Sequence, residues 1–104
     1  MHRKFAFHER PAATVTCAAR VVDGAIADAR ISVGSVGNVA VRASGAETLL
    51  IGAASDDGEA VAAAAAQAAA VSNPVEDANG SAEYKAHLVE VMVGRALREV
   101  LLAA

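Results

Sequence analysis

An Asp-Gly pair at residues 23 and 24 separates two apolar runs, AATVTCAARVV before the pair and AIADARISV after it. The two positions of the tightest hairpin turns need a positive φ, which Asp and Gly tolerate better than most residues. β-branched residues, which favour strands, recur in both runs. The sequence therefore predicts an antiparallel hairpin with strands over residues 12–22 and 25–33.

The second run alternates between apolar and polar positions. This period of two predicts a half-buried strand, with inward-facing side chains at Ala27, Ala29, Ile31 and Val33. The segment GSVG, residues 34–37, interrupts the pattern, and NVAVRA resumes it. A third short strand is expected over residues 38–43, which gives a three-stranded antiparallel meander.

Three helices are expected after the sheet, over residues 45–51, 57–71 and 81–102. Asp56 and Glu59 have the spacing of a capping box at the start of the second helix, and Ser81 is placed to cap the third. Nine of the eleven residues 60–70 are alanine. Such a tract is compatible with a linker, but its high helix propensity and small side chains favour a closely packed helix.

Strands followed by helices predict an α+β fold, a small antiparallel sheet with the helices packed on one face. The length of 104 residues fits a single domain spanning residues 1–104. The last helix is apolar on more than one side, so we expect it to contact two surfaces. Because alanine supplies much of the apolar content, the core is thin, and we expect either marginal stability of the domain alone or support from a partner surface.

The net charge of −3, with both signs interspersed, gives no basic footprint for nucleic acid or for an anionic membrane. No apolar segment is long enough for a membrane span. Cys17 is the only cysteine, so no internal disulfide and no multi-cysteine metal site can form within the chain. These features indicate a cytoplasmic protein that binds neither nucleic acid nor membrane.

No combination of residues in the sequence forms a recognisable catalytic site. The three histidines, His2, His8 and His87, lack the spacing of zinc ligands and are interpreted as surface or interface residues. Cys17, inside a predicted strand, is interpreted as a small buried apolar residue rather than a reactive thiol. For Tyr84, the single tyrosine, we expect packing in the core or at an interface.

Three segments in this order resemble the C-terminal domain of the FAD-binding medium subunit of molybdenum hydroxylases, the group that includes carbon monoxide dehydrogenase and xanthine dehydrogenase. The segments are DGAIADARISVGSVGNVAVRA, the alanine-rich helix and PVEDANGSAEYKAHLVEVMVGRAL. The similarity includes a DG turn followed by ARI, the pair Arg42-Ala43, and a G-S-x-x-Y-K pattern from Gly80 to Lys85. It extends over essentially the whole chain from about Lys4.

The resemblance implies a domain that is not catalytic alone and that belongs to an oxidoreductase containing molybdenum, FAD and iron-sulfur clusters. FAD would be held mainly by preceding domains of the subunit, and partners would be those domains together with the molybdenum and iron-sulfur subunits. In the family an acidic residue often precedes the strand nearest the flavin, whereas this sequence has Pro11 and Ala12 there. Thr14 is then the remaining candidate for an FAD-proximal residue, with no catalytic and no metal-binding residue expected.

Two functions are therefore open from the sequence. In the first, the domain supports the flavin site and the packing of subunits during electron transfer from iron-sulfur clusters to FAD. In the second, it is a stand-alone interaction module, a homodimer that keeps the fold without the redox role.

Overall fold

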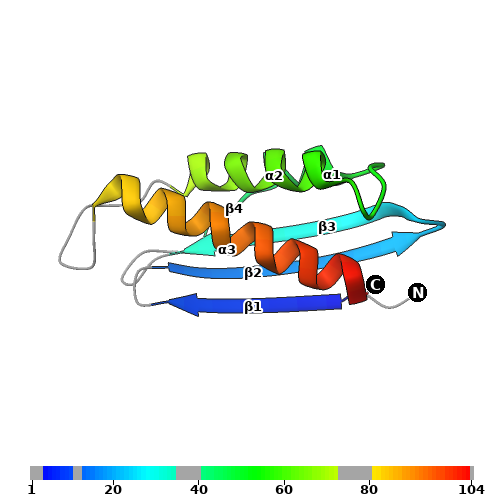
Figure 1. Cartoon of the computed structure of the whole chain (residues 1–104), viewed down its shortest axis with the longest axis horizontal. Coiled ribbons are helices and arrows are strands. Elements are labelled where there is room, and N and C mark those ends of the chain that lie inside the picture. Colours follow the sequence, from blue (N-terminus) through cyan, green and yellow to red (C-terminus); the bar gives the residue numbers. More distant parts are fainter. Residues whose placement is uncertain (1–3, 11–12, 35–40, 73–80, 104) are drawn as a thin grey trace.

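In the computed structural model, which describes residues 4–10, 13–34, 41–72 and 81–103, four strands form one antiparallel sheet (Figure 1). They lie in chain order and each pairs with the next, as in a meander. The strands are β1 (Lys4–Arg10), β2 (Ala13–Val22), β3 (Ala25–Gly34) and β4 (Val41–Arg42). The predicted α+β class is confirmed, but the sheet has four strands instead of the predicted three.

β1 is the strand that the sequence-based prediction lacked. It pairs with β2 along its whole length, with Phe5 opposite Ala18 and Ala6 opposite Cys17. Its sequence KFAFHER does alternate, but charged residues at both ends and the small Ala6 give a weak apolar pattern. β1 is stabilised by its pairing with β2, which supplies its interstrand hydrogen bonds, because its own weak apolar pattern gives little preference for a strand.

The turn between β2 and β3 has the predicted geometry, since Asp23 and Gly24 have φ values of 52° and 78°. The prediction for the start of β3 is partly wrong. Ala27 has no partner in the register, because Asp28 lies opposite Arg20 and Ile26 lies opposite the next β2 residue. Such a bulge reverses the alternation on one side of it. Ile26 is therefore buried and Ala27 exposed, whereas the other three residues predicted to point inward are buried.

The third predicted strand, residues 38–43, is described only in part. β4 covers Val41–Arg42, and residues 38–40 lie outside the described residues. Beyond β4, the backbone of residues 52–54 also meets the edge of β3. The N–H of Ile26 donates to the carbonyl of Ala53 at 2.8 Å, and the N–H of Gly52 donates to the carbonyl of Ile26 at 2.8 Å. A short strand and a loop thus share the edge of β3.

Three helices lie over one face of the sheet in the described part of the chain (Figure 1). They are α1 (Ser44–Leu50), α2 (Gly58–Val71) and α3 (Ala82–Ala103). α3 packs on β1 and β2, α1 packs on β3, and α2 contacts both of the other helices. The expectation that the last helix contacts two surfaces is confirmed, because α3 lies against both the sheet and α2.

The cap of α2 lies one residue away from the predicted position. The N-cap of α2 is Asp57 rather than Asp56, and its carboxylate accepts the backbone N–H groups of Glu59 and Ala60, each at 3.1 Å. Ser81 does cap α3, because its hydroxyl accepts the N–H of Tyr84 at 3.1 Å. Each cap satisfies N–H groups that the first helical turn leaves without an intrahelical partner.

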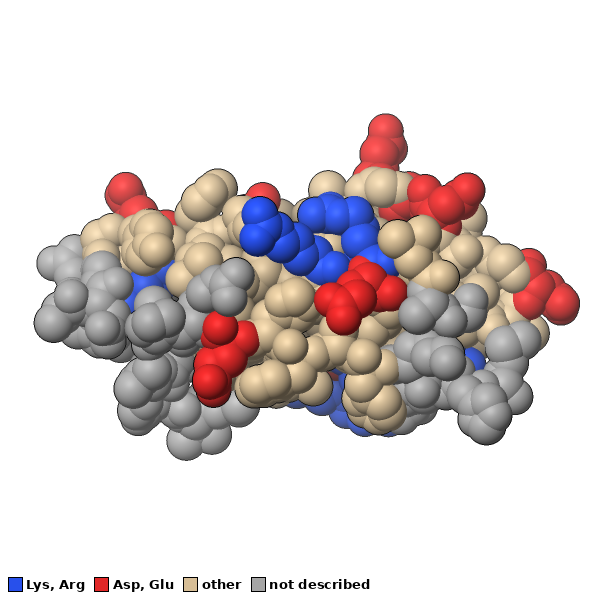
Figure 2. All heavy atoms as spheres, turned by 60° about the horizontal axis from the view of Figure 1, so that its bottom comes forward, with Lys and Arg blue, Asp and Glu red and all other residues tan. Residues whose placement is uncertain are grey.

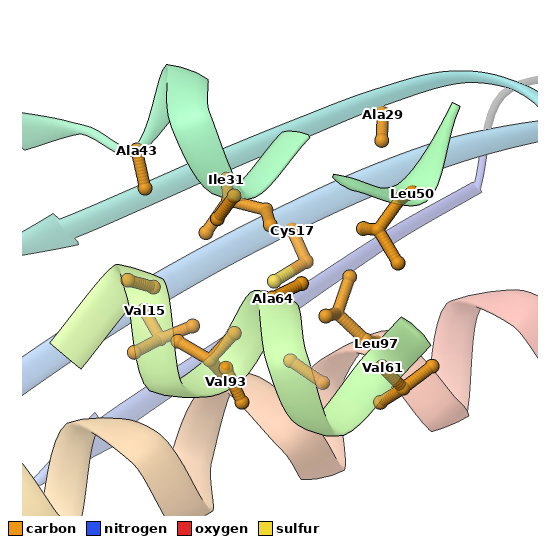
Figure 3. Close-up of a cluster of buried hydrophobic side chains, with 14 of the residues drawn as sticks. Val15, Cys17, Ala29, Ile31, Ala43, Leu50, Val61, Ala64, Val93 and Leu97 are labelled. Atoms are coloured by element: carbon orange, nitrogen blue, oxygen red, sulfur yellow. The ribbon is translucent and has the colours of Figure 1, made fainter. Parts of the chain in front are cut away.

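Small side chains fill the core between the sheet and the helices (Figure 3). In the close-up, Cys17 and Ile31 from the sheet point toward Ala64 of α2 and Leu97 of α3. The buried face of α2 follows a helical repeat: Val61, Ala64, Ala65, Ala68 and Ala69. The alanine tract is therefore a packed helix, and its methyl side chains let α2 approach its neighbours closely.

Candidate functional site

The candidate site lies on the face of the sheet opposite the helices, which is called the uncovered face below. The described helices all lie on the other side (Figure 1). Side chains alternate along a strand, so Phe5 and Phe7 of β1 share this face with Thr16 and Ala18, their register partners in β2. Phe5 is 70% exposed and Phe7 is 63% exposed. The uncovered face thus presents two large apolar rings to the surroundings.

An open pocket of about 230 Å³ lies on the uncovered face. Residues of all four strands and of α1 line it: Phe5, Thr16, Ala18, Arg30, Ile31, Ser32, Arg42 and Glu47. Its lining combines apolar surface with two arginines and one carboxylate. The pocket can receive one side chain of a bound partner, but it lies on a surface and does not enclose a reaction.

Glu47 connects the pocket to the edge of the sheet. Its side chain is only 7% exposed, and its Oε2 accepts the backbone N–H of Ile31 at 2.9 Å. The carbonyl of Ile31 accepts the backbone N–H of Ala43, in the chain after β4, at 2.8 Å. The carboxylate therefore takes the acceptor position that a neighbouring strand would otherwise fill, and it satisfies a buried donor.

Arg42 holds this carboxylate from the side of the uncovered face. Its Nη2 donates to Glu47 Oε1 at 2.7 Å, and its Nε lies 3.0 Å from each carboxylate oxygen. These hydrogen bonds and the negative charge raise the pKa of Arg42, with a further contribution from Asp28. Two-point pairing of this kind fixes the orientation of the guanidinium. The wall of the pocket nearest β4 is therefore a fixed ion pair.

Cys17 lies on the helix-covered face and is fully buried, as predicted. Burial, followed by the negative charge of Glu47, raises the pKa of the Cys17 thiol to about 12. A thiol with this pKa stays protonated at neutral pH, and the thiolate is the reactive form. Cys17 is a packing residue of the core.

Thr14, the residue expected near FAD from the resemblance, is half-buried in β2 opposite Glu9 and Gly34. It shares the uncovered face with Thr16, two positions further along the strand, and Thr16 lines the pocket. Thr14 therefore lies beside the pocket but is not one of the residues that line it. The expected position of Thr14 near FAD stays a prediction.

The remaining candidates are dispersed. His8 Nε2 lies 2.9 Å from Glu99 Oε2, which links β1 to α3, and His87 is exposed on α3. Tyr84 is 53% exposed, so the expectation of a core position is wrong, and an interface role stays a prediction. His2, Pro11, Ala12 and the segments 35–40 and 73–80 lie outside the described residues.

Among the described residues, no group of three or more His, Cys, Asp or Glu side chains could hold a metal ion. No helix in the described part of the chain is long and apolar enough to cross a membrane. On the face shown in Figure 2, acidic and basic side chains lie next to one another among a larger area of other residues. The described surface thus offers binding features, among them the open pocket on the uncovered face, whose lining includes the aromatic side chain of Phe5.

Sequence reasoning did not identify Phe5, Phe7 or Glu47 as site residues. The alternation of residues 5–8 was a signal for the two phenylalanines, and it would have placed them on one face. Glu47 has no comparable signal, because its role depends on how closely α1 approaches β3.

Comparison with known proteins gives a consistent result. Residues 3–100 match the family model described as the CO dehydrogenase flavoprotein C-terminal domain. No match was found among curated protein sequences. Carbon monoxide dehydrogenase from Hydrogenophaga pseudoflava has a chain that is 33% identical with a TM-score of 0.87, over 97% of this chain and 37% of that one.

Two further solved structures are similar. Reconstituted CO dehydrogenase from Oligotropha carboxidovorans matches at 27% identity with a TM-score of 0.89, over 98% of this chain and 38% of that chain. Quinoline 2-oxidoreductase from Pseudomonas putida 86 matches at 24% identity with a TM-score of 0.86, over 99% and 38% of the two chains, and shows the shared fold. The chain thus spans less than two fifths of the length of these chains, and it belongs to the CO dehydrogenase flavoprotein C-terminal domain family.

Proposed function

We propose that this chain serves as the C-terminal domain of the FAD-binding subunit of a molybdenum hydroxylase-type oxidoreductase. Its role is to support the flavin site and the packing of subunits, and it catalyses no reaction by itself. The observation that carries the proposal is the family match over residues 3–100. The fold supports it too, because all helices of the described residues lie on one side of the sheet and the other side is available for the rest of the subunit.

FAD does not fit the described residues as a complete site. The pocket on the uncovered face measures about 230 Å³, whereas pockets that enclose even drug-sized ligands measure about 300–1,000 Å³. FAD is larger than most such ligands. We therefore propose that preceding domains of the subunit hold FAD and that this domain contributes at most a wall, with Thr14 as the candidate residue nearest to the flavin.

The proposed partners follow from the same reasoning. The domain would pack against the preceding FAD-binding domains, in a complex that also holds molybdenum and iron-sulfur subunits. Electrons would pass from the iron-sulfur clusters to FAD, and the redox chemistry would belong to the flavin. We propose a cytoplasmic location for this complex.

A reconstitution experiment tests the proposal. The 104-residue chain would be mixed with FAD and with the part of the Hydrogenophaga pseudoflava chain that lies outside the match, prepared as a separate polypeptide. We expect the chain alone to retain no flavin absorbance after gel filtration, and the mixture to elute as one complex that retains it. Tight FAD binding by the chain alone would contradict the proposal. So would a homodimer of this chain that does not associate with the flavoprotein segment, which is the result expected of a stand-alone module.

A further inference from the structure

Leu102, in the last turn of α3, is the most exposed large apolar side chain among the described residues, at 89%. It helps to line a second open pocket, of about 230 Å³, between the start of α2 and the end of α3. Both helix ends lie toward the same end of the molecule (Figure 1). The buried side chains of Val61 and Leu101 add apolar surface to the lining. One small area therefore carries both a projecting leucine and a hollow that can receive one.

Charged side chains of both signs also line this second pocket. Asp56 precedes α2, and Arg98 lies on α3, about one helical turn before Leu102. Both are exposed, and neither has an ion-pair partner among the described residues. The neighbouring Asp57 differs, because its carboxylate already accepts backbone N–H groups of α2. Asp56 and Arg98 are thus the two charges that a partner would meet.

A second copy of this chain matches these features. In a two-fold interface the same patch of two copies comes together, so every contact is made twice. Arg98 of each copy can then pair with Asp56 of the other, on either side of the two Leu102 side chains. A purely acidic partner would leave Asp56 unmatched, and a purely basic one would leave Arg98 unmatched. The partner needs both signs and an exposed apolar side chain, which a second copy carries in the same arrangement.

We infer that this chain forms a two-fold homodimer through the second pocket, with Leu102 of each copy entering the pocket of the other. This dimer goes beyond the proposed function and does not rest on it. The interface lies at the helix ends and leaves the uncovered face free for the flavin-binding domains (Figure 1). Because the patch is small, the dimer is reversible and forms at micromolar to millimolar concentrations.

Sedimentation equilibrium of the 104-residue chain tests the dimer, over concentrations from about 10 μM to about 1 mM. The average mass should rise with concentration from that of a monomer toward that of a dimer. Leu102→Ala should raise the dissociation constant about tenfold or more, because each dimer loses two central side chains. Leu49→Ala, at a leucine of α1 that is 48% exposed and outside the pocket, should change it less than about twofold. A chain that stays monomeric throughout overturns the inference.

A charge exchange tests the two-fold pairing. Arg98→Glu and Asp56→Arg should each raise the dissociation constant about tenfold or more, because like charges then face each other twice. An equimolar mixture of the two variants should recover the wild-type affinity within about threefold, since both pairs again join opposite charges. Recovery also shows that both variants are folded. Arg30→Glu, on the uncovered face, is the matched control and should have little effect. A mixture that does not recover overturns the inference.

Two other results would assign the surfaces differently. If the chain dimerises but Arg30→Glu weakens the dimer and Leu102→Ala does not, the uncovered face is the contact and the inference is overturned. If the chain alone is monomeric but Leu102→Ala weakens its complex with the flavoprotein segment, the second pocket belongs to that complex. The inference then fails while the proposed function stands. A dimer that does not bind the flavoprotein segment gives the opposite result, in which the inference stands and the proposed function fails.

Discussion

Replacement of Glu47 by alanine tests the interpretation that a carboxylate substitutes for a strand at the edge of β3. Glu47 Oε2 accepts the N–H of Ile31 at 2.9 Å, and its Oε1 accepts from Arg42 Nη2 at 2.7 Å. Ile31 is fully buried, and its N–H depends on this carboxylate for a hydrogen-bond acceptor. The variant should therefore weaken the fold at one identifiable group.

The expected loss can be worked out from these contacts. A buried donor left without an acceptor costs about 1–3 kcal/mol, and the loss of one buried methylene adds about 0.8 kcal/mol. Glu47→Ala should thus lower the free energy of unfolding by about 2–4 kcal/mol. Glu47→Gln keeps an oxygen that accepts from Ile31 and should lose only about 1 kcal/mol. Since a chain of this length has a total stability of about 5–15 kcal/mol, the difference is measurable.

Urea unfolding followed by far-UV circular dichroism is the assay. With a denaturant dependence of about 2 kcal/mol per molar urea, the middle of the range for small proteins, the alanine variant should reach its unfolding midpoint at a urea concentration about 1–2 M lower than wild type. Thr48→Ala serves as the control, because Thr48 is exposed on the next position of α1 and should change stability by less than about 0.5 kcal/mol. Equal losses for Glu47→Gln and Glu47→Ala would refute the reasoning, since they would show that the acceptor for Ile31 does not matter.

Three further predictions concern the core and the α2 cap. Because the pKa of Cys17 rises from 9.0 to about 12 on folding, the unfolded chain loses the thiol proton first. The contribution of Cys17 to the free energy of unfolding should be fully present below pH 9. It should fall by about 1.4 kcal/mol per pH unit as the pH rises toward 12. Urea midpoints measured across that pH range should therefore fall more steeply for wild type than for Cys17→Ala. Parallel curves of midpoint against pH would contradict this prediction. Asp57→Ala should cost about 1 kcal/mol through the lost cap, and Asp56→Ala less than about 0.5 kcal/mol; equal effects in urea titrations would restore Asp56 as the cap. Ala64→Leu should destabilise the fully packed side of α2 by about 1–3 kcal/mol in the same assay, whereas Ala66→Leu, on its exposed side, should be nearly neutral.

The parts of the fold that the sequence predicted are those fixed by local signals. The turn at Asp23 and Gly24 needs only the φ preference of two residues, and the helices follow from propensity and capping groups within a few positions. β1 was missed because its stability comes from β2 and α3, which are distant in sequence. Ala27 was assigned to the wrong face for a similar reason, since a bulge is a property of the pairing of two strands and not of one strand.

The candidate site was less accessible to sequence reasoning than the fold. The resemblance directed attention to Thr14 alone, and the structure places it on the uncovered face, next to the pocket-lining residue Thr16. The residues that shape the pocket, however, come from several elements and include Phe5 and Glu47, whose neighbours are set by the tertiary fold. No local pattern distinguishes a glutamate that completes a sheet edge from one that faces solvent.

The alanine-rich core and the exposed aromatic rings have a common physical consequence. Helices with methyl side chains can lie close to their neighbours, but each buried alanine contributes less to stability than a larger residue would. The domain therefore keeps its two largest apolar side chains on the face where burial requires a partner. If the flavin-binding portion binds there, it stabilises the folded state by mass action, by about 2.7 kcal/mol at a concentration 100 times the Kd. We thus expect the thermal midpoint of this chain to rise on addition of that portion. If the two exposed rings are buried in the complex, the rise should be much smaller when Phe5 and Phe7 are replaced by alanine.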